Sequence, residues 1–392
     1  MSAGEIAKMT KLMRNDRNWF GSVGGDGIER SGRRSFSILP TAFSLLIALT
    51  VCSSCKNGGV EPPPPPAGTD TTSHEFVWQI DTLGDASSIL NDVFIIDENN
   101  IWAVGEIYLR DSTGQIDPQA YNAAVWDGNT WKVRRVTVDF RGNMITPPLE
   151  GIIAFSSTDI WLVGSLPIHG DGTNWVLHDL RSMPRMDSVS LSKAWGASSL
   201  SIYFVGRAGS LVFFNGSSWQ KLESGTSLTI QDIWGAKNEA TGEWDILAVA
   251  SNRQINEGKE VLRLSSTSVT KLPTVGLPWS LRGVWFVPGK KYYVIGDGIY
   301  HTSSIDSLPP WDGGVNEITT YYGYAIRGNG VNDVVICGAF GDFLHFNGST
   351  WHQYAELQQN DRVFYRVAFK GNTIAIVGIQ GNRALAIRGT RY

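Results

Sequence analysis

Residues Leu191–Leu222 read L-S-K-A-W-G-A-S-S-L-S-I-Y-F-V-G-R-A-G-S-L-V-F-F-N-G-S-S-W-Q-K-L. Short apolar and aromatic runs alternate here with Gly and Ser, which predicts three β-strands and the start of a fourth. Asn215-Gly216 lies between two apolar runs and predicts a type I′ hairpin, in which both central residues have positive φ. The stretch therefore indicates one small antiparallel sheet.

The motif apolar-aromatic-apolar-apolar-Gly of residues 202–206 recurs along the chain, in several places more loosely. Its seven copies end at Gly105, Gly164, Gly206, Ala250, Gly296, Gly338 and Gly378, so the successive intervals are 59, 42, 44, 46, 42 and 40 residues. A period of roughly 40–50 residues with four short strands per copy is typical of β-propeller blades. Helical repeats do not fit, because the runs are short, β-branched and aromatic.

The two ends of the repeat region predict how the ring closes. The last copy has room for three strands only, at 364–369, 373–377 and 383–388, whereas an extra strand-like run, 76–83, precedes the first copy. We therefore expect an all-β, seven-bladed β-propeller over residues 76–392, with the N-terminal strand completing the last blade. This closure leaves no unpaired sheet edge at the junction.

Composition excludes some classes of function and structure. The 392 residues include 43 Gly and 15 Trp, only 18% are charged, and the net charge of −4 gives no basis for nucleic-acid binding. The three cysteines are Cys52, Cys55 and Cys337, so the repeat region cannot contain an internal disulfide. Because Cys337 lies in an apolar strand, we expect it to be a buried structural thiol.

The N-terminal residues have the pattern of an export signal. Arg30, Arg33 and Arg34 precede an apolar run at 38–51, which is too short for a membrane-spanning helix of about 20 residues. A positive flank, a short apolar core and small residues after it are typical of a secretory signal peptide. We assign residues 1–54 to a signal peptide with an unusually long N-terminal region.

The end of this signal, L-T-V-C-S-S-C-K at 49–56, resembles the lipobox of bacterial lipoproteins. Cys55 fits the lipidated position because Ser53 and Ser54 precede it, although Cys52 stands where the family usually has Leu. The resemblance implies lipidation at Cys55, export, and a membrane anchor in the bacterial cell envelope, with the outer membrane as the expected location. An ordinary secretory signal with incidental cysteines is the alternative.

Residues 55–75 follow as a tether that contains five consecutive prolines at 62–66. Such a run forms a short polyproline II rod, which would hold the repeat domain away from a membrane surface. A leader with no spacing role remains the alternative.

The repeat text itself resembles a family. The pattern (Asp/Asn)-Gly-x-(Ser/Thr)-Trp occurs at 127–131, 215–219 and 347–351. It resembles the repeats of secreted bacterial propellers of the BNR or Asp-box-like class, which includes sialidases, other glycan-active proteins and non-enzymatic binding proteins. Only half of the full Asp-box is kept, so the resemblance implies the fold but not an activity.

One column of the aligned repeats is a candidate site. The position two residues before the first core residue of each inner strand is polar or aromatic in every copy: Asn91, Glu150, Ser192, Gln231, Arg282, Tyr324 and Tyr365. These residues are expected at one mouth of the central channel, which we call the top face, where they would form a ligand funnel. The alternative is a set of solvated strand ends around a water-filled channel.

Two further features are expected on the top face. An insertion at 106–122 accounts for the longest interval between copies, and the connections between blades carry aromatic residues, which suit sugar rings or peptide side chains. These aromatic residues are Trp279, Trp311, Tyr321 and Tyr322. A chance cluster of aromatic residues is the alternative.

The sequence favours a monomeric binding or scaffold module for a glycan or protein partner, with no cofactor. The alternative is a sialidase-like, glycan-active enzyme using the same funnel, for which Arg282, Arg366, Arg327, Glu150 and Tyr324 are candidates without a spacing that ties them together. The six histidines show no metal-ligand spacing.

The lipid anchor gives a first prediction. Cys55→Ser removes the lipidated thiol, so the protein is expected to leave the membrane fraction and appear in the soluble fraction. Fractionation followed by immunoblotting measures this, with Cys52→Ser as the matched control that stays with the membrane. Membrane association of the Cys55→Ser protein would rule out lipidation at this position.

Overall fold

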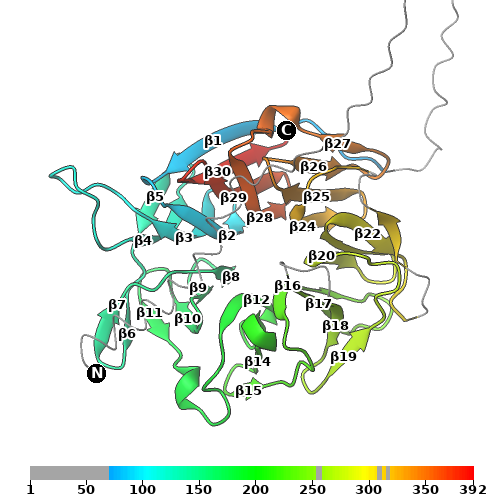
Figure 1. Ribbon diagram of the computed structural model, residues 1–392, viewed down its shortest axis with the longest axis horizontal. Coiled ribbons are helices and arrows are strands. Elements are labelled where there is room, and N and C mark those ends of the chain that lie inside the picture. The colour runs from blue at the N-terminus through cyan, green and yellow to red at the C-terminus, as the bar shows by residue number, and fades with distance from the viewer. Residues whose placement is uncertain (1–69, 253–257, 307–310, 315–317) are drawn as a thin grey trace, which may run out of the picture. The chain divides into compact units, whose positions relative to one another are not determined.

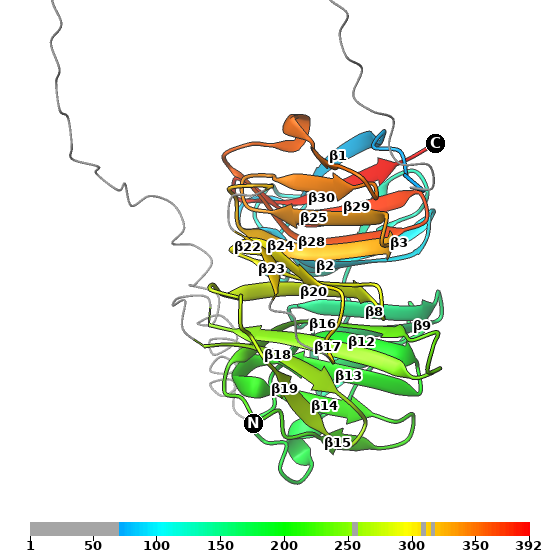
Figure 2. The same ribbon diagram turned by 90° about the vertical axis from the view of Figure 1, so that its right-hand side faces the viewer.

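The computed structural model describes residues 70–252, 258–306, 311–314 and 318–392, and the predicted signal peptide and most of the tether lie outside these ranges. Seven four-stranded antiparallel sheets are arranged as the blades of a β-propeller (Figures 1 and 2). The predicted all-β, seven-bladed fold is therefore confirmed. Among the described residues, none of the helices is long and apolar enough to cross a membrane.

Each blade takes one strand from each of four sets, numbered here outward from the channel. The innermost strands are β2 (Ile89–Asp97), β8 (Gly151–Ser156), β12 (Leu191–Ser198), β16 (Thr229–Lys237), β20 (Leu281–Val287), β24 (Gly323–Gly330) and β28 (Arg362–Lys370). The second strands are β3 (Asn100–Ile107), β9 (Asp159–Val163), β13 (Ser201–Gly206), β17 (Trp244–Ser251), β21 (Lys291–Gly296), β25 (Asp333–Gly338) and β29 (Thr373–Gln380).

The outer half of each blade follows the same order. The third strands are β4 (Tyr121–Trp126), β10 (Pro167–Gly170), β14 (Leu211–Phe214), β18 (Lys259–Leu264), β22 (Gly298–Thr302), β26 (Phe343–Phe346) and β30 (Arg383–Thr390). The outermost strands are β5 (Trp131–Arg134), β11 (Trp175–Leu177), β15 (Trp219–Lys221), β19 (Val269–Leu272), β23 (Asp312–Gly314), β27 (Trp351–Gln353) and β1 (Val77–Leu83). Short 3-10 turns lie at η1 (Leu180–Ser182), η2 (Arg207–Gly209) and η3 (Ala355–Leu357).

A separate hairpin, β6 (Val138–Phe140) and β7 (Asn143–Ile145), lies in the connection from blade 1 to blade 2. It shares the longest interval between repeats with the loop that joins β3 to β4. The insertion at 106–122 is therefore only part of the reason for that interval.

The faces of neighbouring blades share the hydrophobic core. Ile101 and Ala103 of β3 pack in one cluster with Ala375 and Val377 of β29, so this cluster joins blades 1 and 7. Alternate residues of each strand point to opposite faces of its sheet, and each face meets a neighbouring blade. A single blade could not bury both of its faces, so the ring is the unit that folds.

The repeated (Asp/Asn)-Gly turn differs from the expected type. The side-chain oxygen of Asn215 accepts hydrogen bonds from the amides of Ser217 and Ser218, at 3.0 and 2.8 Å. Gly216 has a φ of 90°, but Asn215 does not have a positive φ. The predicted type I′ turn is therefore wrong, because the side-chain cap on the following amides replaces the second left-handed residue.

The expected ring closure is confirmed. β1 pairs with β30 in an antiparallel register from Val77↔Thr390 to Leu83↔Ala384, which gives blade 7 the order β1-β30-β29-β28. Phe76 and Trp78 pack against the core that blades 6 and 7 share. The first strand of the domain is thus the outer strand of its last blade.

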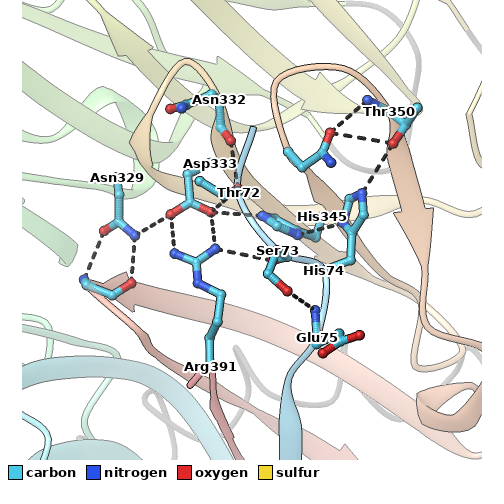
Figure 3. Close-up of polar contacts among 12 residues, drawn as sticks. Thr72, Ser73, His74, Glu75, Asn329, Asn332, Asp333, His345, Thr350 and Arg391 are labelled. Atoms are coloured by element: carbon cyan, nitrogen blue, oxygen red, sulfur yellow. Dashed lines mark hydrogen bonds and ion pairs between the residues drawn. The ribbon is translucent and has the colours of Figure 1, made fainter. Parts of the chain in front are cut away.

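A polar cluster at Asp333, which we call the clasp, ties both ends of the domain to blade 6 (Figure 3). Arg391 donates to both carboxylate oxygens of Asp333 at 2.8 Å, and Thr72 and His345 bind Oδ1 at 3.1 and 2.8 Å. Nδ1 of His345 lies 2.8 Å from Nδ1 of His74. Since the Asp333 carboxylate accepts the proton on His345 Nε2, a neutral His345 accepts from His74 Nδ1–H.

The clasp's ion pair predicts a loss of stability on substitution. Arg391→Gln leaves Asp333 buried without its cation, so the free energy of unfolding is expected to fall by about 3 kcal/mol. Urea denaturation measures this. The control Arg383→Gln changes an exposed arginine on β30 and is expected to cost less than about 0.5 kcal/mol. Equal effects of the two substitutions would contradict the role of the clasp.

The clasp also predicts a dependence on pH. Burial, followed by the proximity of His345 and His352, lowers the pKa of His74 from 6.5 to about 4. Between these values the unfolded chain binds the proton and the folded chain does not, so stability falls as the pH falls from 6.5 towards 4. Urea denaturation at pH 7.5 and pH 5 is expected to show a smaller loss for His74→Gln than for the natural chain. Equal losses would contradict this prediction.

Candidate functional site

A β-bulge places the predicted funnel residues at the start of the inner strands. The pairing register between inner and second strands shifts at Asn91, Ser192, Gln231, Arg282, Tyr324 and Tyr365. In the remaining blade, the amide of Glu150 donates to the carbonyl of Val163, which also faces Gly151 in the ladder. All seven positions of the predicted column are therefore structurally equivalent, and we call them the ring.

A small residue ends the sequence motif opposite this bulge: it is glycine in six blades and Ala250 in blade 4, where the bulge at Gln231 is kept. Gly206 pairs with Leu191, the residue before the bulge at Ser192. A Cβ on Gly206 would lie 2.1 Å from the carbonyl oxygen of Ser190, which is far inside van der Waals contact. The repeated glycine thus lets the entering backbone approach the second strand, and the bulged residue follows directly.

Four ring residues form a continuous chain of contacts across blades 4 to 7. Arg282 donates to Oε1 of Gln231 and lies 5.0 Å from the centre of the Tyr324 ring. Tyr324 in turn meets Tyr365 edge to face, with their centroids 5.7 Å apart. Gln231, Arg282 and Tyr365 are buried, whereas Tyr324 is partly exposed. These four residues form a packed aromatic and cationic cluster, of which Tyr324 is the partly exposed member.

The other ring residues have partners of their own. Asn91 donates to the carbonyl of Leu149 at 2.8 Å, and Glu150 pairs with Arg207 of η2 at 3.1 Å. Ser192 is partly exposed. The structure therefore brings together Gln231, Arg282, Tyr324 and Tyr365, but not these three.

Aromatic residues extend the ring outward at blade 6. Tyr322 contacts Tyr324 edge to face at 5.4 Å, and its hydroxyl lies 3.1 Å from Oγ of Ser280. Tyr321 lies 5.4 Å from Phe340, which is 45% exposed and has a φ of 58°. Ala208 has a φ of 49° at the equivalent position of blade 3, so the left-handed residue belongs to the repeated turn between the second and third strands. We call Tyr321, Tyr322 and Phe340 the aromatic lip.

Trp279 and Trp311, the other two aromatic residues expected on the top face, differ in how deeply they are buried. Trp279 is partly buried beside the first residues of β20. Trp311 is buried in the core that blades 4 and 5 share, where its indole N–H donates to the carbonyl of Pro273. The expectation that Trp311 belongs to a top-face platform is therefore wrong, because the side chain fills the space between two blades.

A charged layer that the sequence reasoning missed lies beside the ring, one residue past it in four blades and three residues past it at Arg327. Nζ of Lys193 lies 2.7 Å from Asp92, and Arg327 contacts Asp232 through both carboxylate oxygens at 2.9 Å. Each aspartate also accepts a backbone amide of the next blade, from Ile152 and Val284 respectively. The signal was present in the sequence, because Asp92, Lys193, Asp232 and Arg366 directly follow ring residues.

Burial and mutual charge set the protonation of this layer. Burial lowers the pKa of Lys193 to about 7, and the charge of Arg366 adds to this effect. Burial alone would raise the pKa of Asp232, but the charge and hydrogen bonds of Arg327 outweigh it, so that this pKa is lowered. Burial raises the pKa of Cys337 to about 12, as suits a structural thiol.

The candidates for a glycan-active enzyme are spread over two levels of the channel. Arg282 lies in the ring, whereas Arg327 and Arg366 are bound in the charged layer below it. Glu150 pairs with Arg207 rather than with Tyr324. In the part of the chain that is described, no group of three or more His, Cys, Asp or Glu side chains could hold a metal ion.

Solved structures share the fold at low sequence identity. "YCF48 bound to D1 peptide" aligns over 80% of this chain and 97% of its own, with a TM-score of 0.60 and 18% identity. YCF48 from Cyanidioschyzon merolae covers 79% and 98% (TM-score 0.56, 15% identity). Virginiamycin B lyase from Staphylococcus aureus covers 81% and 100% (TM-score 0.57, 10% identity). No protein-family model matches the chain, and no curated protein matches it. The likeness shows the propeller fold alone.

Proposed function

We propose that this protein is a binding module of the bacterial cell envelope that holds a segment of a protein partner on its top face. The observation that carries the proposal is the exposed side of Tyr324, which Arg282 and Tyr365 support from below and the aromatic lip extends. Aromatic and arginine side chains dominate the binding energy of protein interfaces. The lipid anchor at Cys55 would hold this surface at a membrane.

A protein segment suits this surface better than a sugar does. Tyr322 and Tyr324 meet edge to face, and Tyr324 meets Tyr365 in the same way, so aromatic side chains of a partner could pack against their exposed edges. The YCF48 structure, which shares the fold, has a bound peptide. A glycan ligand and a sialidase-like activity are therefore outcomes that the experiment must separate from the proposal.

Site-specific photo-crosslinking in the native envelope tests the proposal. A photoreactive phenylalanine analogue in place of Phe340, in the aromatic lip, is expected to give a protein adduct. The same analogue in place of Leu200 is the control, because Leu200 is 64% exposed in the turn between β12 and β13. Truncation of a central aromatic contact typically costs about 2 kcal/mol, so Tyr324→Ala is expected to weaken binding about 30-fold and to remove most of the adduct.

The possible results differ for each kind of partner. Mass spectrometry of a protein adduct that depends on Tyr324 supports the proposal. A carbohydrate adduct would overturn the proposal in favour of a glycan ligand. Release of sugar from envelope glycans by the purified chain would overturn it in favour of a sialidase-like activity. Equal protein adducts at positions 340 and 200 would indicate a scaffold whose contacts do not depend on the top face, and would also contradict the proposal.

A further inference from the structure

The charged layer contains an unequal number of cations and anions. Its described members are Asp92 and Asp232 on one side and Lys193, Arg327 and Arg366 on the other. The four side chains in its two ion pairs are 2–17% exposed, so they are largely removed from water. Lys193 of blade 3 pairs with Asp92 of blade 1, and Arg327 of blade 6 pairs with Asp232 of blade 4. The blade between the partners has a glycine at the position of the aspartate, Gly151 in blade 2 and Gly283 in blade 5.

Arg366 is the cation without a counterion. It is 7% exposed, and its guanidinium donates to the backbone carbonyls of Tyr365, Gln231 and Tyr324 at 2.8, 3.1 and 3.3 Å. Its Nε is buried without a hydrogen-bond acceptor. Within the described residues, no carboxylate forms an ion pair with Arg366. Backbone carbonyls satisfy donors but carry no net charge, so the positive charge is balanced only in part, by Asp232 at a distance.

The surplus charge acts on Lys193. Burying a charge without a partner costs several kcal/mol, which a protein avoids by releasing a proton or by binding a counterion. Arg366 cannot release its proton, because a guanidinium remains charged in proteins. Lys193 is therefore the group in the layer that can adjust, and burial and Arg366 together bring its pKa to about 7.

We propose that the charged layer binds one small monovalent anion, a halide or a carboxylate group, beside Arg366 and Lys193. The anion would lie beside the guanidinium of Arg366 and balance the third cation. It would also keep the proton on Lys193, whose other charged neighbours are Asp92 and Asp232 on β2 and β16. Arg327 on β24 neutralises Asp232, and Cys337 on β25 stays protonated, so neither competes for the anion.

Salt-dependent unfolding of the full-length chain tests this inference without knowledge of any partner. Sodium gluconate, whose anion is large, is replaced stepwise by sodium chloride, bromide or formate at constant ionic strength, and the urea midpoint is measured. A ligand of the folded state raises stability in a saturable way. Because binding is linked to one proton with a pKa near 7, the apparent Kd is expected to be about tenfold lower at pH 6 than at pH 8.

Matched variants separate a specific site from general salt effects. Arg366→Gln keeps an N–H donor for the carbonyls but removes the charge, so the saturable stabilisation is expected to vanish. Arg263→Gln is the control, because Arg263 pairs with Asp245 and Asp306 away from the layer. This variant is expected to retain the saturable stabilisation by the anion. If Arg366→Gln does not fold, Lys193→Met leaves two cations with two carboxylates and is expected to lose the effect too.

The choice of anions identifies the source of the ligand. Saturation by chloride and bromide alone would assign the site to a free ion, and bromide in crystals would give an anomalous peak beside Arg366. Saturation by formate as well would assign it to a carboxylate, as a partner could supply. Absence of saturation with all three salts, or an unchanged effect in Arg366→Gln, would overturn the inference. None of these outcomes depends on the crosslinking at Phe340.

Discussion

The pairing of β1 with β30 is the constraint on which the rest of the structure depends. Each blade buries its faces only against its neighbours, so an open propeller would expose two apolar faces and the edge of β30. The strand that prevents this comes from the opposite end of the domain and pairs through seven residues, from Val77↔Thr390 to Leu83↔Ala384. The clasp at Asp333 then fixes this strand to blade 6, since Thr72, Arg391 and His345 meet on one carboxylate (Figure 3). The inner strands hold their positions around the channel because the propeller is closed.

Fold and candidate site are joined by one local device, the bulge opposite the motif glycine. Gly206 has no side chain to hold the entering backbone away, so the chain before β12 approaches the second strand, and Ser192 becomes the extra residue of the pair. The bulge recurs with Ala250 in place of the glycine in blade 4, so every blade has one ring residue at the start of its inner strand. The residues that repeat most clearly therefore set the backbone, while the residues that vary beside them determine the chemistry. That division explains why the repeat text resembles a family of propellers without indicating a ligand.

The sequence predicted what local patterns determine and missed what distant blades determine. The blade number, the closing strand and the ring column follow from periodicity, and all three are found in the structure. The turn at Asn215 was predicted with the wrong backbone, because a side-chain cap competes with the type I′ geometry. Trp311 was misplaced, because its burial depends on the connection of another blade. The charged layer was missed for the same reason: Lys193 of blade 3 meets Asp92 of blade 1 where the blade between them has Gly151, and spacing along the chain does not report such a contact.

The ring and the charged layer are adjacent along one strand, which makes their electrostatics inseparable. Tyr365 belongs to the ring, and Arg366, the next residue, carries the charge that no described carboxylate neutralises. Arg366 and Tyr365 are buried, so this field reaches the ring with less screening than at an open surface. A hydrophobic layer of similar volume would hold the blades together at least as well as buried ion pairs do. Stability alone therefore does not account for an odd number of buried charges, and the proposed anion would supply the missing negative charge when Lys193 keeps its proton.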